Sequence, residues 1–216
     1  MNAPQGLLLD AMGTLIGLRR SVGHIYAETA ADHGLELEAE ALDAAFAAAY
    51  AKAPPLAFPH VESAHLEQAE RAWWQQRIET CFKAVGVQPL PIGLSSELFD
   101  RFAGPELWGV YPEVPAALER WRQRGLKLVV VSNFDRRLLR LLEQLDVRQW
   151  LDAVLVSSEV GAAKPDPALL YAALEQLQLQ ADEAWLVGDS SADAQAAAAA
   201  GMHCLKLNRP NGILLG

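Results

Sequence analysis

The sequence predicts an α/β fold in which helices cover both faces of a parallel sheet, with an all-helical segment inserted near the N-terminus. Beyond Tyr111, short apolar stretches alternate with helical ones, as in βαβ units. A run of three leucines at residues 7–9 predicts one more strand, buried on both faces. Between these parts, residues 21–105 have helical periodicity without strand alternation.

Length and composition are those of a folded globular protein. The chain has 216 residues, of which 51% are hydrophobic and 21% charged, so it can bury a substantial core. The 18 Lys and Arg against 27 Asp and Glu give a formal charge of −9. This balance repels nucleic acid and anionic membrane surfaces, and we expect neither as a partner.

The cysteines and the N-terminus indicate a cytoplasmic protein. Cys81 and Cys204 are far apart and have no CxxC spacing, so we expect neither a disulfide framework nor a zinc site. The N-terminus has no basic segment followed by a long apolar run, which argues against a signal peptide or a membrane span.

Four helices are expected in the inserted segment. The first ends near Gly34, and the second ends before Pro54. The third runs over about residues 61–86, and the fourth over residues 95–102. The third has an apolar stripe that includes Trp74, with Trp73 beside it, and we expect both tryptophans to pack in a core. The alternating part predicts strands at residues 126–131, 153–156, 184–187 and 204–207, and helices at residues 115–124, 135–145, 167–177 and 191–200.

Polar residues follow several of these strands. Taken singly, each has an ordinary explanation as a turn residue, a helix cap or a solvated charge. Because the carboxyl ends of parallel strands meet at one edge of a sheet, we expect these side chains to converge in one crevice. They are Asp10, Ser132, Asn133, Lys164, Asp189 and Asp193.

The expected crevice has the chemistry of a phosphate site. Three carboxylates at close range cannot all stay ionised without a cation, and oxygen ligands suit Mg²⁺. Phosphoryl transfer needs a nucleophile and positive groups around the transferring oxygens. Asp10 can serve as a covalent nucleophile, and Lys164, Ser132 and Mg²⁺ supply the remaining groups.

These residues resemble the four motifs of the haloacid dehalogenase superfamily. The motifs here are Asp10-x-x-Gly13-Thr14, Ser132-Asn133, Lys164-Pro165-Asp166-Pro167 and Gly188-Asp189-x-x-x-Asp193. The resemblance implies a Rossmann-like core at residues 1–16 and 106–216, with a four-helix cap domain at residues 17–105.

The resemblance also implies a role for each residue. Asp10 would be the nucleophile and a magnesium ligand, with the backbone carbonyl of Met12 as another ligand. Lys164 would offset the charge of nucleophile and phosphate, and Ser132 and Asn133 would bind the phosphoryl group. Asp189 would hold the metal, and Asp193 would support it directly or through water.

Met12 departs from the phosphatase pattern. Phosphatases of the superfamily carry there a second Asp, which protonates the leaving oxygen, and Met12 cannot transfer a proton. A positioned general acid contributes roughly 10²–10⁴ in rate, so esters with poor leaving groups should suffer most.

Three functions therefore stay open. The first is a Mg²⁺-dependent phosphatase acting on a small phosphorylated metabolite through an aspartyl-phosphate, slowed by Met12 or restricted to good leaving groups. The second is a 2-haloacid dehalogenase, although that group lacks the metal site and has Ser-Asn where this chain has Gly188-Asp189. The third is a phosphometabolite-binding or interaction protein. We expect a monomer or homodimer, with Arg19, Arg20 and His24 as possible cap contacts to substrate.

Overall fold

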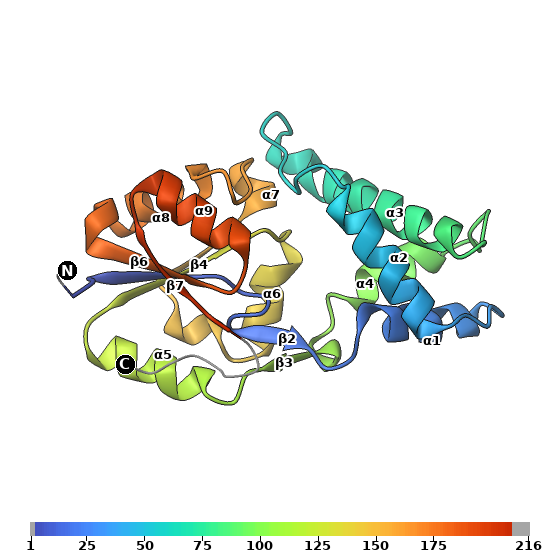
Figure 1. The fold of residues 1–216 in the computed structure, drawn as a ribbon, viewed down its shortest axis with the longest axis horizontal. Helices are drawn as coiled ribbons and strands as arrows, with labels where there is room; N and C mark the ends of the chain where they lie inside the picture. The colour runs from blue at the N-terminus through green and yellow to red at the C-terminus, as the bar shows by residue number, and fades with distance from the viewer. Residues whose placement is uncertain (1–2, 209–216) are drawn as a thin grey trace.

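The core of the protein is a five-stranded parallel sheet (Figure 1). The structure is a computed structural model that describes residues 3–208. The strand order is β5-β4-β1-β6-β7, with β1 at Gly6–Leu9, β4 at Lys127–Ser132, β5 at Ala153–Val156, β6 at Ala184–Gly188 and β7 at His203–Lys206. This confirms the predicted α/β class.

The central strand β1 explains why the leucine run shows no polar alternation. It pairs in parallel with β4 on one side and β6 on the other, so that Leu8 lies opposite both Val129 and Leu186. All four residues of β1 are buried. A strand in the middle of a sheet that is covered on both faces has no solvent side, so each position is apolar.

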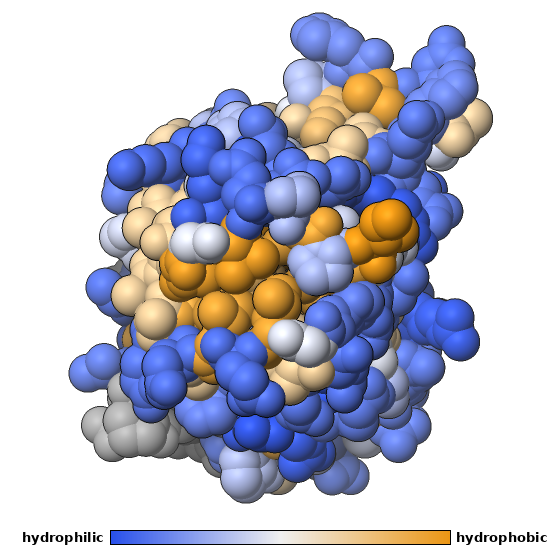
Figure 2. Space-filling view, turned by 90° about the vertical axis from the view of Figure 1, so that its right-hand side faces the viewer, coloured by the Kyte–Doolittle hydropathy of each residue, from blue (hydrophilic) through white to orange (hydrophobic). Residues whose placement is uncertain are grey.

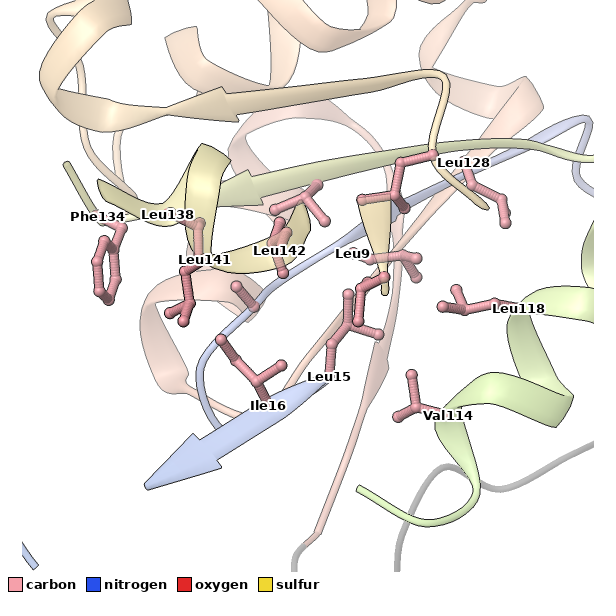
Figure 3. Close-up of a cluster of buried hydrophobic side chains, with 14 of the residues drawn as sticks. Leu9, Leu15, Ile16, Val114, Leu118, Leu128, Phe134, Leu138, Leu141 and Leu142 are labelled. Carbon is pink, nitrogen blue, oxygen red and sulfur yellow. The ribbon is translucent and has the colours of Figure 1, made fainter. Parts of the chain in front are cut away.

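Helices cover both faces of the sheet. One hydrophobic cluster joins Leu7 and Leu9 to helices α5 (Val114–Gln123) and α6 (Arg137–Gln144). Figure 3 shows this cluster, with Leu9 lying between the side chains of the two helices. The other cluster joins Leu8 to α8 (Ala168–Leu177) and α9 (Ser191–Ala200). Successive residues of β1 therefore point into opposite layers, as the period of a strand requires.

The inserted helices form a group beside the sheet (Figure 1). They are α1 (Val22–Asp32), α2 (Ala39–Ala51), α3 (Leu66–Ala84) and α4 (Leu94–Arg101). They share a hydrophobic cluster of their own, built on Tyr26, Leu42, Ile78, Phe82 and Leu94. We call these four helices the insert; the domain boundaries at residues 17 and 105 stay a prediction.

Two features differ from the sequence-based expectations at element ends. Helix α3 begins at Leu66 rather than near residue 61, because a 3-10 turn at Ser63–His65 precedes it. Helix α6 begins at Arg137 rather than at residue 135, where the Asp135 side chain accepts a hydrogen bond from the backbone N–H of Arg137. A side-chain acceptor at a helix start replaces a missing helical partner.

A small antiparallel ribbon, not expected from the sequence, joins the insert to the core. It consists of β2 (Ile16–Leu18) and β3 (Trp108–Val110), with Ile16 opposite Val110. Each strand has three residues, and the two strands are about 90 positions apart in the chain, so no local sequence pattern predicts them. The short elements also include α7 (Ser157–Val160) and 3-10 turns at Pro105–Leu107, Arg148–Trp150 and Ala181–Glu183.

The surface at the insert end carries an apolar area bordered by hydrophilic side chains (Figure 2). Within the described part of the chain, every helix is too short or too polar to cross a bilayer.

Candidate active site

Asp10 lies where β1 ends, in a tight loop. Its side chain is almost fully buried, and its backbone N–H donates to the carbonyl of Val187 at 2.9 Å. Gly13 follows in the same loop with a φ of +85°. A Cβ at Gly13 would lie 2.4 Å from a carboxylate oxygen of Asp189, so only glycine lets these two loops approach.

Lys164 links the acidic residues of this edge. Its Nζ lies 2.7 Å from Oδ1 of Asp10 and 2.6 Å from Oδ1 of Asp193, and donates to the carbonyl of Val131 at 2.8 Å. Burial alone would lower the pKa of Lys164, but the charges of Asp10 and Asp193 outweigh it and raise that pKa. Lys164 is therefore a buried ammonium group with three oxygen partners.

The protein environment makes the carboxyl group of Asp10 a weaker acid than it is in water. Burial raises the pKa of Asp10 to about 6, Lys164 opposes that rise, and the neighbouring charges of Asp193 and Asp189 add to it. A cation beside these carboxylates would remove the repulsion and favour the ionised form.

Asp10, Asp189 and Asp193 form an acidic cluster. One ligand atom from each lies within 4.8 Å of the others. Among the described residues, the Asp189 carboxylate has no hydrogen-bond or ion-pair partner, although it faces two other carboxylates. Three carboxylates and one ammonium leave excess negative charge, and an all-oxygen donor set fits a hard cation such as Mg²⁺.

Asp193 also has a structural function. Its Oδ2 accepts hydrogen bonds from the backbone N–H of Ser190 at 3.0 Å and from the Ser190 hydroxyl at 2.6 Å, which forms a capping box at the start of α9. Gly188 permits this arrangement, because a Cβ there would lie 2.5 Å from the Asp193 carboxylate. Asp193 therefore caps α9 and at the same time lies beside Lys164 and within the acidic cluster.

Ser132 is the last residue of β4 and Asn133 follows it, but their side chains differ in whether they are free to bind a ligand. Ser132 lines the pocket, and its hydroxyl has no hydrogen-bond partner among the described residues. The Asn133 amide instead donates to the backbone carbonyl of Lys164 at 2.7 Å and accepts from its N–H at 2.8 Å. Asn133 therefore positions Lys164, and its side chain is occupied.

A pocket of about 580 Å³ extends from this edge of the sheet towards the insert. Asp10, Met12, Ser132 and Lys164 line its core side, and aromatic side chains line much of the rest. Trp74 lines the pocket, contrary to the expectation that it packs in a core. Trp73 is buried as expected, and its indole N–H donates to the carbonyl of Pro54 at 3.1 Å.

The structure does not bring Arg19, Arg20 and His24 into the lining of this pocket. The guanidinium of Arg19 donates to the Trp108 carbonyl, Arg20 pairs with Glu28, and His24 bonds to the Ser21 hydroxyl. Each of these three side chains is therefore already engaged with another group of the protein.

Arg137 was not among the expected site residues, but it lines the pocket. Its Nε and Nη2 donate to the two carboxylate oxygens of Asp135 at 2.8 and 2.7 Å, and its Nη1 donates to the Phe99 carbonyl at 2.6 Å. Asp135 and Arg137 closely follow Ser132-Asn133, so their place at this edge was readable from the sequence. Their pairing with residues of the insert was not.

The parallel core and its crevice of carboxylates, lysine and free hydroxyl are those of an α/β enzyme whose site lies at the carboxyl ends of the strands. Comparison with known protein families identifies the family of enzymes within this class. The family model described as "haloacid dehalogenase-like hydrolase" matches residues 4–201, so the chain belongs to this family of hydrolases.

The relatives carry names of two kinds, a hydrolase domain-containing protein and a phosphatase. "Haloacid dehalogenase-like hydrolase domain-containing protein 3" of Bos taurus is 39% identical over 207 residues, covering 94% of this chain and 82% of the relative. A phosphoglycolate phosphatase of Pseudomonas fluorescens is 27% identical over 137 residues, covering 62% of this chain and 50% of the relative.

Solved structures share the fold at low sequence identity. L-2-haloacid dehalogenase from Xanthobacter autotrophicus superimposes with a TM-score of 0.70 and 16% identity, covering 95% of this chain and 78% of that one. A predicted phosphoglycolate phosphatase from Haemophilus somnus has a TM-score of 0.68 and 19% identity, covering 95% and 86%. These likenesses concern the fold.

Proposed function

We propose that this protein is a Mg²⁺-dependent phosphatase that cleaves a small phosphate monoester through a phosphorylated Asp10. The observation that carries the proposal is the position of Lys164, which is ion-paired with Asp10 and Asp193 beside the carboxylate of Asp189, a group without a partner among residues 3–208. Such a site can hold a dianionic phosphate only if cations balance the carboxylates. Phosphatase relatives support the same chemistry.

The residues divide the reaction between them. Oδ1 of Asp10 is engaged with Lys164, so the second oxygen is the one available to attack phosphorus. The phosphorus–oxygen bond to the alcohol breaks as the aspartyl bond forms, and the alcohol oxygen leaves with the electron pair. The departing oxygen takes a proton from water. A second water then attacks phosphorus and gives up a proton to solvent, and the bond between phosphorus and Asp10 breaks, which releases inorganic phosphate and restores the Asp10 carboxylate. Ser132 donates to a phosphoryl oxygen throughout.

Asp10, Asp189, Asp193 and the Met12 carbonyl would hold the metal ion. When bound, Mg²⁺ neutralises the carboxylates and the phosphoryl oxygens. Lys164 keeps Asp10 ionised, and Asn133 keeps Lys164 in place through its backbone.

The experiment is hydrolysis of 4-nitrophenyl phosphate by the wild type, by Asp10→Asn and by Asp182→Asn, with Mg²⁺ and with EDTA. Asp182 is an exposed matched control outside the pocket. We expect Mg²⁺-dependent turnover that falls roughly 10³-fold or more in Asp10→Asn and is kept in Asp182→Asn. Equal turnover by Asp10→Asn would overturn the nucleophile assignment.

Further assays of the same wild-type protein, on 2-chloropropionate, on other phosphates and for Mg²⁺ binding, test the alternative functions. Metal-independent release of chloride from 2-chloropropionate would favour the dehalogenase function. The third carboxylate, Asp189, argues against it, because displacement at carbon needs no cation. Binding of Mg²⁺ with no turnover of any phosphate or haloacid would favour a binding protein.

A further inference from the structure

The pocket wall above Asp10 is aromatic. Five rings from the helices of the insert and one from the residue directly after α4 line it. Further rings from β3 and from the loops after β3 and β4 extend this wall. The six are Tyr26, Phe46, Tyr50, Trp74, Phe99 and Phe102. A cavity of about 580 Å³ with this lining has room for a ring-bearing substrate beside its phosphate.

The rings support one another. Tyr26 packs edge to face on Phe46 at 5.9 Å, Phe46 stacks on Tyr50 at 5.8 Å, and Tyr50 stacks on Trp74 at 6.3 Å. This series runs from α1 through α2 to α3, so each ring is held by a neighbour before any ligand arrives. Preformed aromatic faces bind flat apolar groups with little loss of side-chain freedom.

Among the residues that the structure describes, the pocket lining offers no uncommitted cation for a second anionic group. In the described lining, the cationic side chains are Lys164 and Arg137. Lys164 is taken up by Asp10 and Asp193. The Arg137 guanidinium is bound to Asp135 and to the Phe99 carbonyl, and its centre lies 3.8 Å from the Phe99 ring centroid. A carboxylate placed among the rings would stay unpaired, which is costly.

Met12 restricts the leaving group independently. It lines the pocket two positions after Asp10, and its thioether has no proton to donate. An aliphatic alkoxide is a poor leaving group without that proton. A phenol has a pKa of about 10, so its oxygen can depart as phenoxide and take a proton from water afterwards.

We propose that the substrates are phosphate monoesters of uncharged aromatic alcohols of the phenol type; this rests on the proposed phosphatase function. The aromatic wall holds the ring, and the ring stabilises the departing oxygen that Met12 cannot protonate. The products are the free phenol and inorganic phosphate.

The test compares kcat/KM of the wild type, with Mg²⁺, on four compounds. Phenyl phosphate carries the ring, 4-carboxyphenyl phosphate adds an anion to it, acetyl phosphate has a good leaving group without a ring, and phosphoglycolate has an anion without a ring. We expect kcat/KM for phenyl phosphate to exceed that for 4-carboxyphenyl phosphate and that for phosphoglycolate by roughly tenfold or more. The difference from 4-carboxyphenyl phosphate should arise mainly from a higher KM for that compound.

Variants of Tyr50 show whether the wall causes that preference. Tyr50 is 42% exposed, so its replacement spares the core. Tyr50→Ala should lower the ratio of phenyl phosphate to acetyl phosphate turnover several-fold, and Tyr50→Phe, which keeps the ring, should preserve it. Tyr171→Ala is the matched control, since Tyr171 is 49% exposed and lies outside the pocket.

The outcomes separate the inference from the function on which it rests. Asp10-dependent turnover of 4-carboxyphenyl phosphate or phosphoglycolate at least equal to that of phenyl phosphate would overturn the preference for uncharged aromatic substrates and leave the phosphatase function standing. An unchanged ratio in Tyr50→Ala would remove the wall as its cause. No Asp10-dependent turnover of any of the four would overturn both.

Discussion

The indole N–H of Trp74 donates a 2.6 Å hydrogen bond to Oδ2 of Asp135. Trp74 belongs to helix α3 of the insert, and Asp135 lies completely buried in the loop after β4. The bond therefore ties the aromatic wall to the strand end that carries Ser132. Arg137 strengthens the connection, because it binds Asp135 on the core side and the Phe99 carbonyl on the insert side.

Replacing Trp74 by Phe should weaken this connection. Asp135 loses one of its donors, and we expect the free energy of unfolding to fall by about 1–3 kcal/mol. The KM for phenyl phosphate should rise several-fold, because the wall loses its tie to the core. Trp73→Phe is the control: it also removes an indole hydrogen bond, to Pro54, but Trp73 lies outside the pocket lining. Equal KM effects of the two variants would contradict the prediction; urea unfolding and steady-state kinetics measure both.

Replacing Lys164 by Met should destabilise the fold as well as abolish turnover. The change leaves the carboxylates of Asp10 and Asp193 buried without their cation, which costs about 3–5 kcal/mol. Added Mg²⁺ should restore part of the lost free energy of unfolding, since a bound cation replaces the missing charge. Lys206→Met, at an exposed lysine of β7, should change stability by less than about 0.5 kcal/mol. Urea unfolding with and without Mg²⁺ checks this, and a fully stable Lys164→Met protein would contradict it.

Replacing Met12 by Asp should restore the missing proton donor. We expect turnover of an alkyl ester such as ethyl phosphate to rise by about 10²-fold, and that of 4-nitrophenyl phosphate to rise much less. Met12 is 46% exposed, so a carboxyl group can be accommodated there. Met12→Asn is the control, because Asn has the shape of Asp but no carboxyl proton to transfer. It should bring no gain in turnover. Similar gains in both variants would show that the effect is not proton transfer.

Cys81 should make the protein less stable in alkali. Burial raises the pKa of its thiol to about 12, whereas in the unfolded chain the thiol loses its proton above a pH of about 8.5. Between these values the unfolded state binds fewer protons than the folded state, so the free energy of unfolding falls as pH rises, by at most about 1.4 kcal/mol per pH unit. Cys81→Ala should flatten this slope between pH 9 and 11 in urea unfolding. Cys204→Ala should flatten it less, because Cys204 is only half-buried. An unchanged slope in Cys81→Ala would contradict the assignment.

Much of the fold was predictable because it depends on local patterns. The leucine run, the β-branched strand that became β4 and the alanine-rich helix α9 each have a length and periodicity that admit one structure. The order of elements then requires a parallel sheet, because helical crossovers connect its strands.

The members of the site were predictable for a related reason. Asp10 and Asp189 each follow a strand, and Ser132 ends one. Because these strands are neighbours in the sheet, parallel topology alone places the three residues at one edge. Asn133 shows the limit of this reasoning. Its position was predicted, but its amide hydrogen-bonds to the backbone of Lys164. That contact depends on a loop 31 residues away in the chain.

The sequence by itself thus determined the α/β class, the residues at the carboxyl edge of the sheet and the absence of an acid at Met12. These follow from periodicity, chain order and residue chemistry. Only the tertiary structure decided what faces Asp10 across the pocket. The aromatic wall, the capture of Arg137 by Asp135, and the placement of Arg19, Arg20 and His24 away from the pocket depend on packing between segments tens of residues apart. Such contacts are set by the shape and charge of whole surfaces, which a local pattern does not contain.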